Sequence, residues 1–206
     1  ILNSYPIAIE NLYYSFPDVA AIKRQSEDED AWLCDALDEA VANHPDKVKH
    51  TYKPKKGDVI KVDDSVTVKV LNNGWFEQDG KHVNHYGNNS GIVYKVQTPA
   101  EPILFLGDMG ERGDEYLKDS WFKSEVETCT VIQMAHHGQD CVSVDFYAAI
   151  KDIKACLYPS ALWIYDNNAG DGFNTFILNS MRYRDFIRER GVTDIYVAAH
   201  VRELIL

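Results

Sequence analysis

The sequence lacks long hydrophobic runs and has little positive charge, and each shortage excludes a class of protein. No apolar stretch reaches the roughly 18 residues that a membrane-spanning helix needs, so we expect no membrane partner. Lys and Arg total 21 against 32 for Asp and Glu, which gives a net charge of −11. Because a protein that holds nucleic acid by its phosphates needs a basic surface, this charge disfavours such a surface. A small anionic substrate held by metal is compatible with it, although solubility alone explains the charge more simply.

Cysteine is scarce, and the cysteines that are present show no paired spacing. Cys34, Cys129, Cys141 and Cys156 lack the C-x-x-C pattern of zinc ribbons. Two of them, Cys129 and Cys156, lie in apolar runs and are expected to be small core residues. Unpaired cysteines favour a reducing compartment, so we expect a cytoplasmic location.

Several catalytic motifs are also absent. The chain contains neither a phosphate-binding loop nor a dinucleotide-binding glycine pattern. Ser90 lies in Asn-Ser-Gly and not in the G-x-S-x-G elbow of serine hydrolases. Cys141 follows His137 closely, but nearness in sequence does not orient a Cys/His pair. A serine or cysteine hydrolase is therefore the weaker alternative.

The length and the hydrophobic pattern indicate one α/β domain over residues 1–206. The chain has 206 residues, of which 45% are hydrophobic, enough for a sizeable core. Alternating apolar residues predict a hairpin between Val59 and Val70, and short strands alternating with helices follow it. This order of elements is typical of a sandwich with a mixed sheet.

Two further expectations concern the first quarter of the chain. Residues 47–56 are basic and polar, and we expect a connector there. A helix with one buried stripe is predicted by apolar residues at helical spacing: Trp32, Leu33, Ala36, Leu37, Ala40 and Val41.

The most informative feature is a pair of short apolar runs that each end in a potential metal ligand. Ile103 to Leu106 leads into Gly107 and Asp108, and the run from Thr130 to Ala135 leads into His136 and His137. Each run is short enough to be a buried strand. Ligands collect at the carboxyl ends of strands in layered α/β proteins, so these polar residues are expected at one rim. Carboxylate oxygen and imidazole nitrogen suit zinc, manganese or iron.

Each of these residues also has an alternative role. Asp108 could cap the helix that follows it. Adjacent strand residues point to opposite faces, so one of His136 and His137 is expected to be a ligand and the other a partner or a base facing the substrate. The remaining histidines are expected to be surface or structural residues, although His82 and His85 have H-x-x-H spacing in a long loop: His44, His50, His82, His85 and His200.

Three motifs together resemble the second half of the metallo-β-lactamase superfamily, in the branch related to the hydrolase domain of the DNA-uptake competence channel. They are Asn88-Asn89-Ser90-Gly91-Ile92-Val93, Phe105-Leu106-Gly107-Asp108 and Ala135-His136-His137-Gly138, in that order. The main metal motif of the superfamily, His-x-His-x-Asp-His, occurs nowhere in the 206 residues. Because the chain starts at Ile1 without methionine, we expect that an upstream segment carries it. The resemblance thus implies an αββα sandwich that lacks part of its N-terminal half.

The resemblance also implies a function. Asp108 is expected to bridge two metal ions, with zinc as the preferred metal. One of His136 and His137 is expected to complete a metal site. Asp108 and His137 are the expected catalytic residues. The implied reaction is hydrolysis of an ester, phosphodiester or amide-type bond in a small-molecule or phosphodiester substrate, with this chain inactive alone. The alternative is a non-catalytic scaffold that kept the fold and lost the site.

A missing half would also leave one sheet face bare. Alternating apolar residues such as Val66, Val68 and Val70, with Leu104 and Leu106 nearby, are expected on that face. We expect the helices of the chain itself, a second copy of the chain or the N-terminal half of the same protein to cover it.

Overall fold

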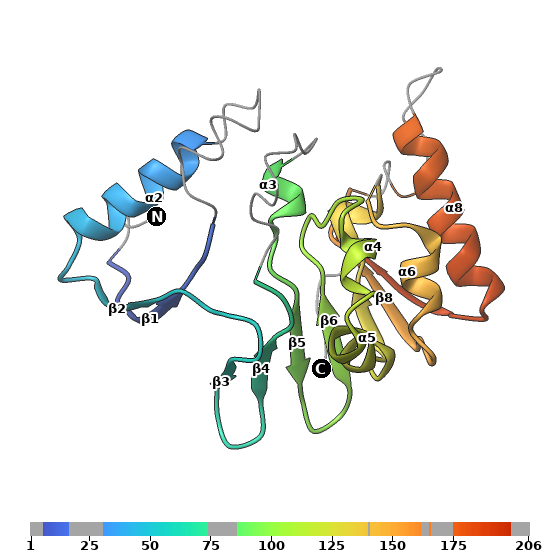
Figure 1. Cartoon of the computed structure of the whole chain (residues 1–206), viewed down its shortest axis with the longest axis horizontal. Coiled ribbons are helices and arrows are strands. Elements are labelled where there is room, and N and C mark those ends of the chain that lie inside the picture. Colours follow the sequence, from blue (N-terminus) through green and yellow to red (C-terminus); the bar gives the residue numbers. More distant parts are fainter. Residues whose placement is uncertain are drawn as a thin grey trace.

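A mixed sheet of seven strands is the largest element of the computed structural model, which describes residues 6–16, 31–73, 86–139, 141–161, 165 and 175–198 (Figure 1). Its strand order is β3-β4-β5-β6-β7-β8-β9. The α/β class and the mixed sheet are thus confirmed. The strands span β3 (Val59–Lys61), β4 (Thr67–Val70), β5 (Tyr94–Gln97), β6 (Pro102–Phe105), β7 (Val131–Gln133), β8 (Ala155–Tyr158) and β9 (Asp194–Val197).

Strand β6 is the junction between the two halves of this sheet. It pairs antiparallel with β5 and parallel with β7, where Ile103 lies opposite Val131. All pairs from β3 to β6 are antiparallel, and all pairs from β6 to β9 are parallel. Parallel neighbours end at the same edge, so the residues that follow β6 and β7 emerge side by side.

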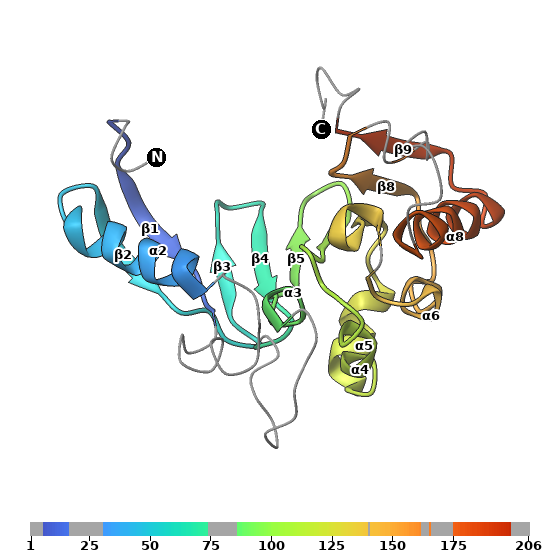
Figure 2. The same cartoon turned by 90° about the horizontal axis from the view of Figure 1, so that it is seen from above.

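The helices that follow β6 lie on one side of the sheet (Figure 2). The core between them and the sheet includes Leu104, Ile132 and Cys156, all of which have 0% exposure. Two of these helices have a side-chain N-cap. The Asp119 side chain accepts hydrogen bonds from two amides in the first turn of α5, and the Ser143 side chain accepts one from the Asp145 amide of α6. These helices are α4 (Gly113–Tyr116), α5 (Ser120–Glu127), α6 (Val144–Ala148) and α8 (Thr175–Glu189).

The opposite face of the sheet carries large apolar side chains that remain partly exposed. Cross-strand pairing places one row of residues on this open face: Val70, Tyr94, Phe105, Gln133, Leu157 and Tyr196. Val70 itself is fully buried, so the expectation of a bare surface is wrong at this residue. Phe105 is 37% exposed and Tyr196 is 40% exposed. A groove of about 750 Å³ on this face is lined by residues that include Tyr13 of strand β1 (Ile9–Tyr13), Tyr94, Gly107 and Gln133.

The expectation that Leu104 and Leu106 share a face with Val68 and Val70 is wrong. Val70 pairs with Tyr94, which pairs with Phe105, so the neighbours of Phe105 in its own strand point the other way. Leu104 and Leu106 are fully buried beneath the helices.

A second, two-stranded sheet lies beside the first and corrects two expectations. Strand β1 (Ile9–Tyr13) pairs parallel with β2 (Val48–Tyr52), so residues 47–56 are not a simple connector. Helix α2 (Ala31–Asn43) lies beside this pair (Figure 1). Its expected buried stripe is wrong at Trp32, which is 59% exposed, at Leu33, which is 51% exposed, and at Ala36, which is also exposed. The other three stripe residues, Leu37, Ala40 and Val41, are half-buried. Helical spacing identifies an apolar side but does not supply the surface that would cover it.

Some predictions fall outside the described residues. These are the expectations for His82, His85 and His200. The helix α3 (Tyr86–Asn89) forms one turn at the end of the predicted long loop. No helix within the described part of the chain is long and apolar enough to cross a membrane.

Candidate functional site

The ends of β6 and β7 bring Asp108 and His137 together. The Nε2 atom of His137 lies 3.5 Å from Oδ1 of Asp108. Both side chains are accessible, with 42% of the His137 side chain and 46% of the Asp108 side chain exposed. The alternative role of Asp108 as a helix cap is wrong, since the N-cap of α4 is Arg112. The carboxylate is therefore available to a ligand.

The other ring nitrogen of His137 identifies its tautomer. Nδ1 lies 2.6 Å from the carbonyl oxygen of Pro159, which follows β8. A carbonyl oxygen can only accept a hydrogen bond, so Nδ1 carries a proton. In the neutral ring, the lone pair then lies on Nε2, the atom that faces Asp108. Histidines that bind metal commonly have this arrangement, in which the remote N–H donates to a backbone carbonyl.

The backbone of the two histidines is unusual. His136 has a φ of 46° and His137 a φ of 62°, and they are the only non-glycine residues with positive φ in the described part of the chain. Gly138 continues the turn with a φ of 77°, and a Cβ there would lie 2.5 Å from the ring of Tyr158. Left-handed backbone at residues with side chains costs about 1–3 kcal/mol each and clusters at functional sites.

His136 points to a different neighbour. Its Nε2 atom lies 3.5 Å from Nδ2 of Asn88, and its ring centroid lies 6.0 Å from that of His137. Strand β7 has ended before both histidines, so the opposite-face rule for strands no longer applies. The structure pairs His137, and not His136, with Asp108.

Gln133 is a site residue that the sequence analysis missed. Its Oε1 accepts from the Leu106 amide at 3.0 Å and from the Gly107 amide at 2.7 Å. Its Nε2 donates to the carbonyl oxygens of Met134 at 2.5 Å and Gly107 at 3.4 Å. A glutamine inside an apolar strand was the available signal, because buried polar groups are nearly always hydrogen-bonded.

Asn88 and Asn89 connect α3 to both loops of the site. Asn88 faces His136, whereas Oδ1 of Asn89 accepts from the Arg112 amide at 2.9 Å. Gly110 makes this approach possible, since a Cβ there would lie 2.8 Å from Asn89 Oδ1. The Asn-Asn motif thus contacts the histidine turn and the loop that follows Asp108.

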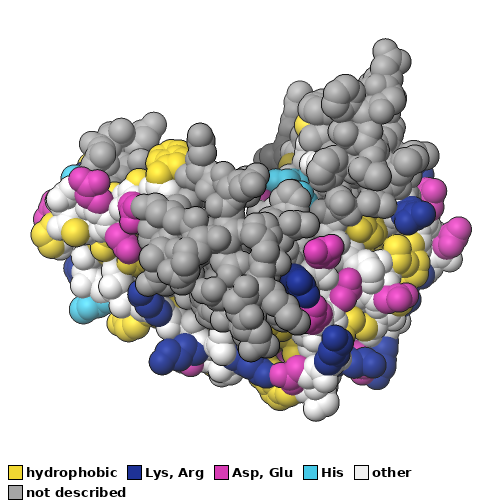
Figure 3. All heavy atoms as spheres, turned by 45° about the horizontal axis from the view of Figure 1, so that its top comes forward, with side chains coloured by type: hydrophobic (Ala, Val, Ile, Leu, Met, Phe, Trp, Pro, Cys, Tyr) yellow, Lys and Arg dark blue, Asp and Glu magenta, His cyan; other side chains and the backbone are white. Residues whose placement is uncertain are grey.

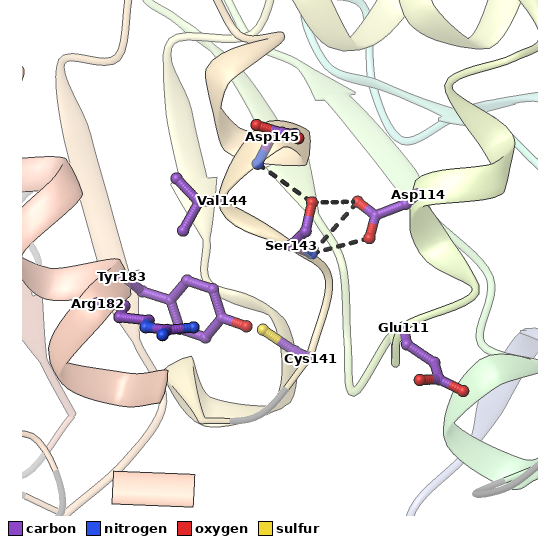
Figure 4. A pocket seen from close by; sticks show the side chains of 8 residues that line it. All are labelled: Glu111, Asp114, Cys141, Ser143, Val144, Asp145, Arg182 and Tyr183. Atoms are coloured by element: carbon purple, nitrogen blue, oxygen red, sulfur yellow. Dashed lines mark hydrogen bonds between the residues drawn. The ribbon is translucent and has the colours of Figure 1, made fainter. Parts of the chain in front are cut away.

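A pocket of about 370 Å³ lies between the segments that follow β6 and β7 and helix α8 (Figure 4). Asp114 points at Ser143 and accepts from its hydroxyl and its amide, each at 3.0 Å. Burial raises the pKa of Asp114, and the hydrogen bonds from Ser143 oppose that increase. Cys141 is buried with its Sγ 3.5 Å from the Tyr147 hydroxyl, so its thiol is not presented as a nucleophile.

The charge on the visible surface is mixed. Figure 3 shows acidic and basic side chains interspersed over the described elements on this face, with no continuous basic area among them.

The Asp108–His137 pair fits part of a metal site. Two ligand atoms about 2.1 Å from a tetrahedral ion lie about 3.4 Å apart, close to the observed separation. No group of three His, Cys, Asp or Glu side chains within the described residues could hold an ion. A metal ion held by this pair would need further ligands.

Comparison of the chain with protein-family models gives no match, and comparison with curated proteins gives no relative.

Proposed function

We propose that this chain belongs to a metal-dependent hydrolase with the αββα fold of the metallo-β-lactamases, and that Asp108 and His137 bind zinc. The observation that carries the proposal is the pair of contacts at His137. Nε2 faces the Asp108 carboxylate at 3.5 Å, while Nδ1–H is fixed on the Pro159 carbonyl at 2.6 Å. Both contacts together orient the imidazole so that Nε2, and not Nδ1, is the nitrogen available to a metal.

Each residue has a distinct role in this proposal. The Asp108 carboxylate has two oxygens, so it could hold one or two metal ions and accept a hydrogen bond from water. His137 contributes one neutral nitrogen ligand. His136, turned toward Asn88, lies beside the pair and can exchange a proton with substrate. Zinc, when bound, activates water for nucleophilic attack near neutral pH.

The proposed substrate class is defined only by the bond that activated water can hydrolyse. Activated water attacks an ester, a phosphodiester or an amide-type bond, and the fold does not select among them. Manganese and iron accept the same nitrogen and oxygen ligands, so they are the alternative metals.

A non-catalytic scaffold is the competing function, and the histidine turn argues against it. Two consecutive histidines with left-handed backbone store strain that a scaffold would not need. Strain of this kind indicates a position that is held for its side-chain geometry.

Hydrolysis by the full-length protein tests the proposal. Zinc-loaded protein is assayed with an aryl ester, bis(p-nitrophenyl) phosphate and a chromogenic lactam. We expect zinc-dependent turnover of at least one substrate, and its loss in His137→Ala. The control is His50→Ala, which changes an exposed histidine on β2. No turnover with any substrate, despite tightly bound zinc, would support the scaffold instead.

A further inference from the structure

We infer that Gln133 is a positioning residue that holds Asp108 and His137 at metal-binding distance. The inference rests on the proposed function, because it concerns the geometry of the same site. Gln133 does not contact the proposed metal ligands, and its effect passes through the backbone on both sides of it.

The carboxamide of Gln133 uses its full hydrogen-bonding capacity. Oε1 accepts two amide hydrogens, and Nε2 donates to two carbonyl oxygens. This pattern fixes which end is oxygen, since amides can only donate and carbonyls can only accept. Gln133 is 9% exposed, and its pairing partners in the flanking strands are the apolar residues Phe105 and Leu157. Loss of the side chain would remove the hydrogen-bond acceptor of the buried Leu106 amide.

These hydrogen bonds connect the two strand ends that carry the site. Gln133 is the last residue of β7, whereas the amides that it binds belong to Leu106 and Gly107, immediately after β6. The Gly107 carbonyl also accepts from the His136 amide at 2.9 Å. Gly107 is thus held at its amide by the strand before the histidines and at its carbonyl by the histidine turn itself.

The hydrogen bonds that hold the Gly107 backbone also restrict the backbone position of Asp108, because Asp108 follows Gly107 directly. Gly107 has a φ of 56°, so the chain turns sharply at the point where Gln133 binds it. A shift of this turn would move the Asp108 carboxylate away from His137 Nε2, since no hydrogen bond within the described residues joins the Asp108 side chain to the rest of the rim. Metal ligands must lie within a few tenths of an ångström of their preferred distances.

Two variants separate positioning from general stabilisation. Gln133→Met keeps an unbranched side chain of similar length and removes all four hydrogen bonds. Gln133→Glu keeps the acceptor oxygen and removes the donors, which places an oxygen against the carbonyls of Gly107 and Met134. The matched control is Lys95→Met, which also removes a buried polar group but lies on β5 among contacts with Glu125 and Thr128.

Two measurements on the full-length protein test the inference. Zinc affinity is measured by competition with a chromophoric chelator, and amide hydrogen exchange is measured without metal. We expect both Gln133 variants to lose about 10–100-fold in zinc affinity, as do changes to groups that orient metal ligands. Amide exchange should accelerate at Leu106, Gly107 and His136. Lys95→Met should leave the zinc affinity and the exchange of these three amides unchanged.

The outcomes are distinct. Faster exchange with unchanged zinc affinity in a folded Gln133 variant would overturn the positioning role and leave a structural one. Equal loss of affinity in Lys95→Met would overturn it as well, because general destabilisation would then explain the effect. If neither Gln133 variant folds, amide hydrogen exchange in the wild-type protein tests the inference. Slow exchange at the Leu106 and Gly107 amides would support their hydrogen bonds to Gln133, and fast exchange would contradict them. Failure of wild-type protein to bind zinc at His137 refutes the proposed function itself.

Discussion

His137 Nε2 and Asp108 Oδ1 lie 3.5 Å apart, although the two residues leave the sheet from different strands. Three features combine to produce this contact. The parallel pairing of β6 and β7 brings both strand ends to one edge, the left-handed turn redirects the His137 ring, and the Pro159 carbonyl holds Nδ1. The surrounding fold thus brings the two residues within reach of each other and fixes the orientation of the His137 ring.

Asp108→Asn should abolish hydrolysis in the full-length protein without unfolding it. Asparagine keeps the shape of the side chain but loses the charge needed to hold two cations. Because Asp108 is exposed, the free energy of unfolding should change by less than about 0.5 kcal/mol. Activity assays and denaturant titrations check both parts, with Asp64→Asn in the β3–β4 turn as the control. Full activity in Asp108→Asn would disprove its assigned role, and unfolding would mean that the carboxylate is structural.

Gly138→Ala should destabilise the protein by about 3 kcal/mol. Left-handed backbone costs alanine about 1–2 kcal/mol, and its Cβ would also press into the buried Tyr158 ring. Gly57→Ala is the matched control, since Gly57 has a φ of 91° but nothing lies within 4 Å of the position that a Cβ would take there. The control should cost about 1 kcal/mol. Equal losses in thermal or denaturant unfolding would show that the Tyr158 contact does not matter.

Glu125→Gln should destabilise the protein more at pH 7 than at pH 3. Burial alone would raise the pKa of Glu125, but Lys69 at 2.8 Å and Lys95 at 2.9 Å outweigh it and lower the pKa. A carboxyl whose folded pKa is lowered stabilises the fold above its unfolded pKa and loses this effect as the pH falls through the folded value. We expect a cost of about 2 kcal/mol at pH 7 that shrinks toward zero in acid. Equal costs in urea titrations at both pH values would contradict the ion-pair assignment.

The open face of the sheet should make the purified chain self-associate. Phe105 and Tyr196 lie in one cross-strand row and are 37% and 40% exposed, and large apolar patches of this kind mark interfaces. Phe105→Lys should therefore shift the chain toward a monomer in light scattering. Lys118→Glu, a charge change in the segment between α4 and α5, is the control. A clean monomer of 23.4 kDa for the unaltered chain would mean that the face needs no cover.

Most strands could be predicted because their signals are local. The hairpin of β3 and β4 and the ends of β6 and β7 follow from alternation and from short apolar runs bounded by turn residues. Strand β2 was missed because its structure depends on backbone pairing with β1, more than thirty residues earlier in the chain, and most of its side chains stay exposed. The exposed side chains of Trp32 and Leu33 were not foreseen, because periodicity reports which side is apolar and not what covers it.

The candidate site could be predicted only in part, for a similar reason. Asp108 and the histidine pair stand out as polar residues that end buried strands. Which of His136 and His137 contacts Asp108 depends on their left-handed backbone and on the carbonyl of Pro159, which directly follows a third strand, β8. Gln133 acts through backbone atoms of a neighbouring strand, and a sequence pattern does not reveal such contacts.

Nitrogen NMR of the histidine side chains during zinc titration tests the central claim most directly. Before zinc is added, the neutral form of His137 should carry its proton on Nδ1 and not on Nε2. Zinc should then shift the Nε2 signal of His137 while its Nδ1 proton remains, and it should not shift Nε2 of His136. Asp108→Asn should weaken the response, because it removes the charged partner 3.5 Å away. A zinc response at His136 with none at His137, or a His137 that carries its proton on Nε2, would contradict the account.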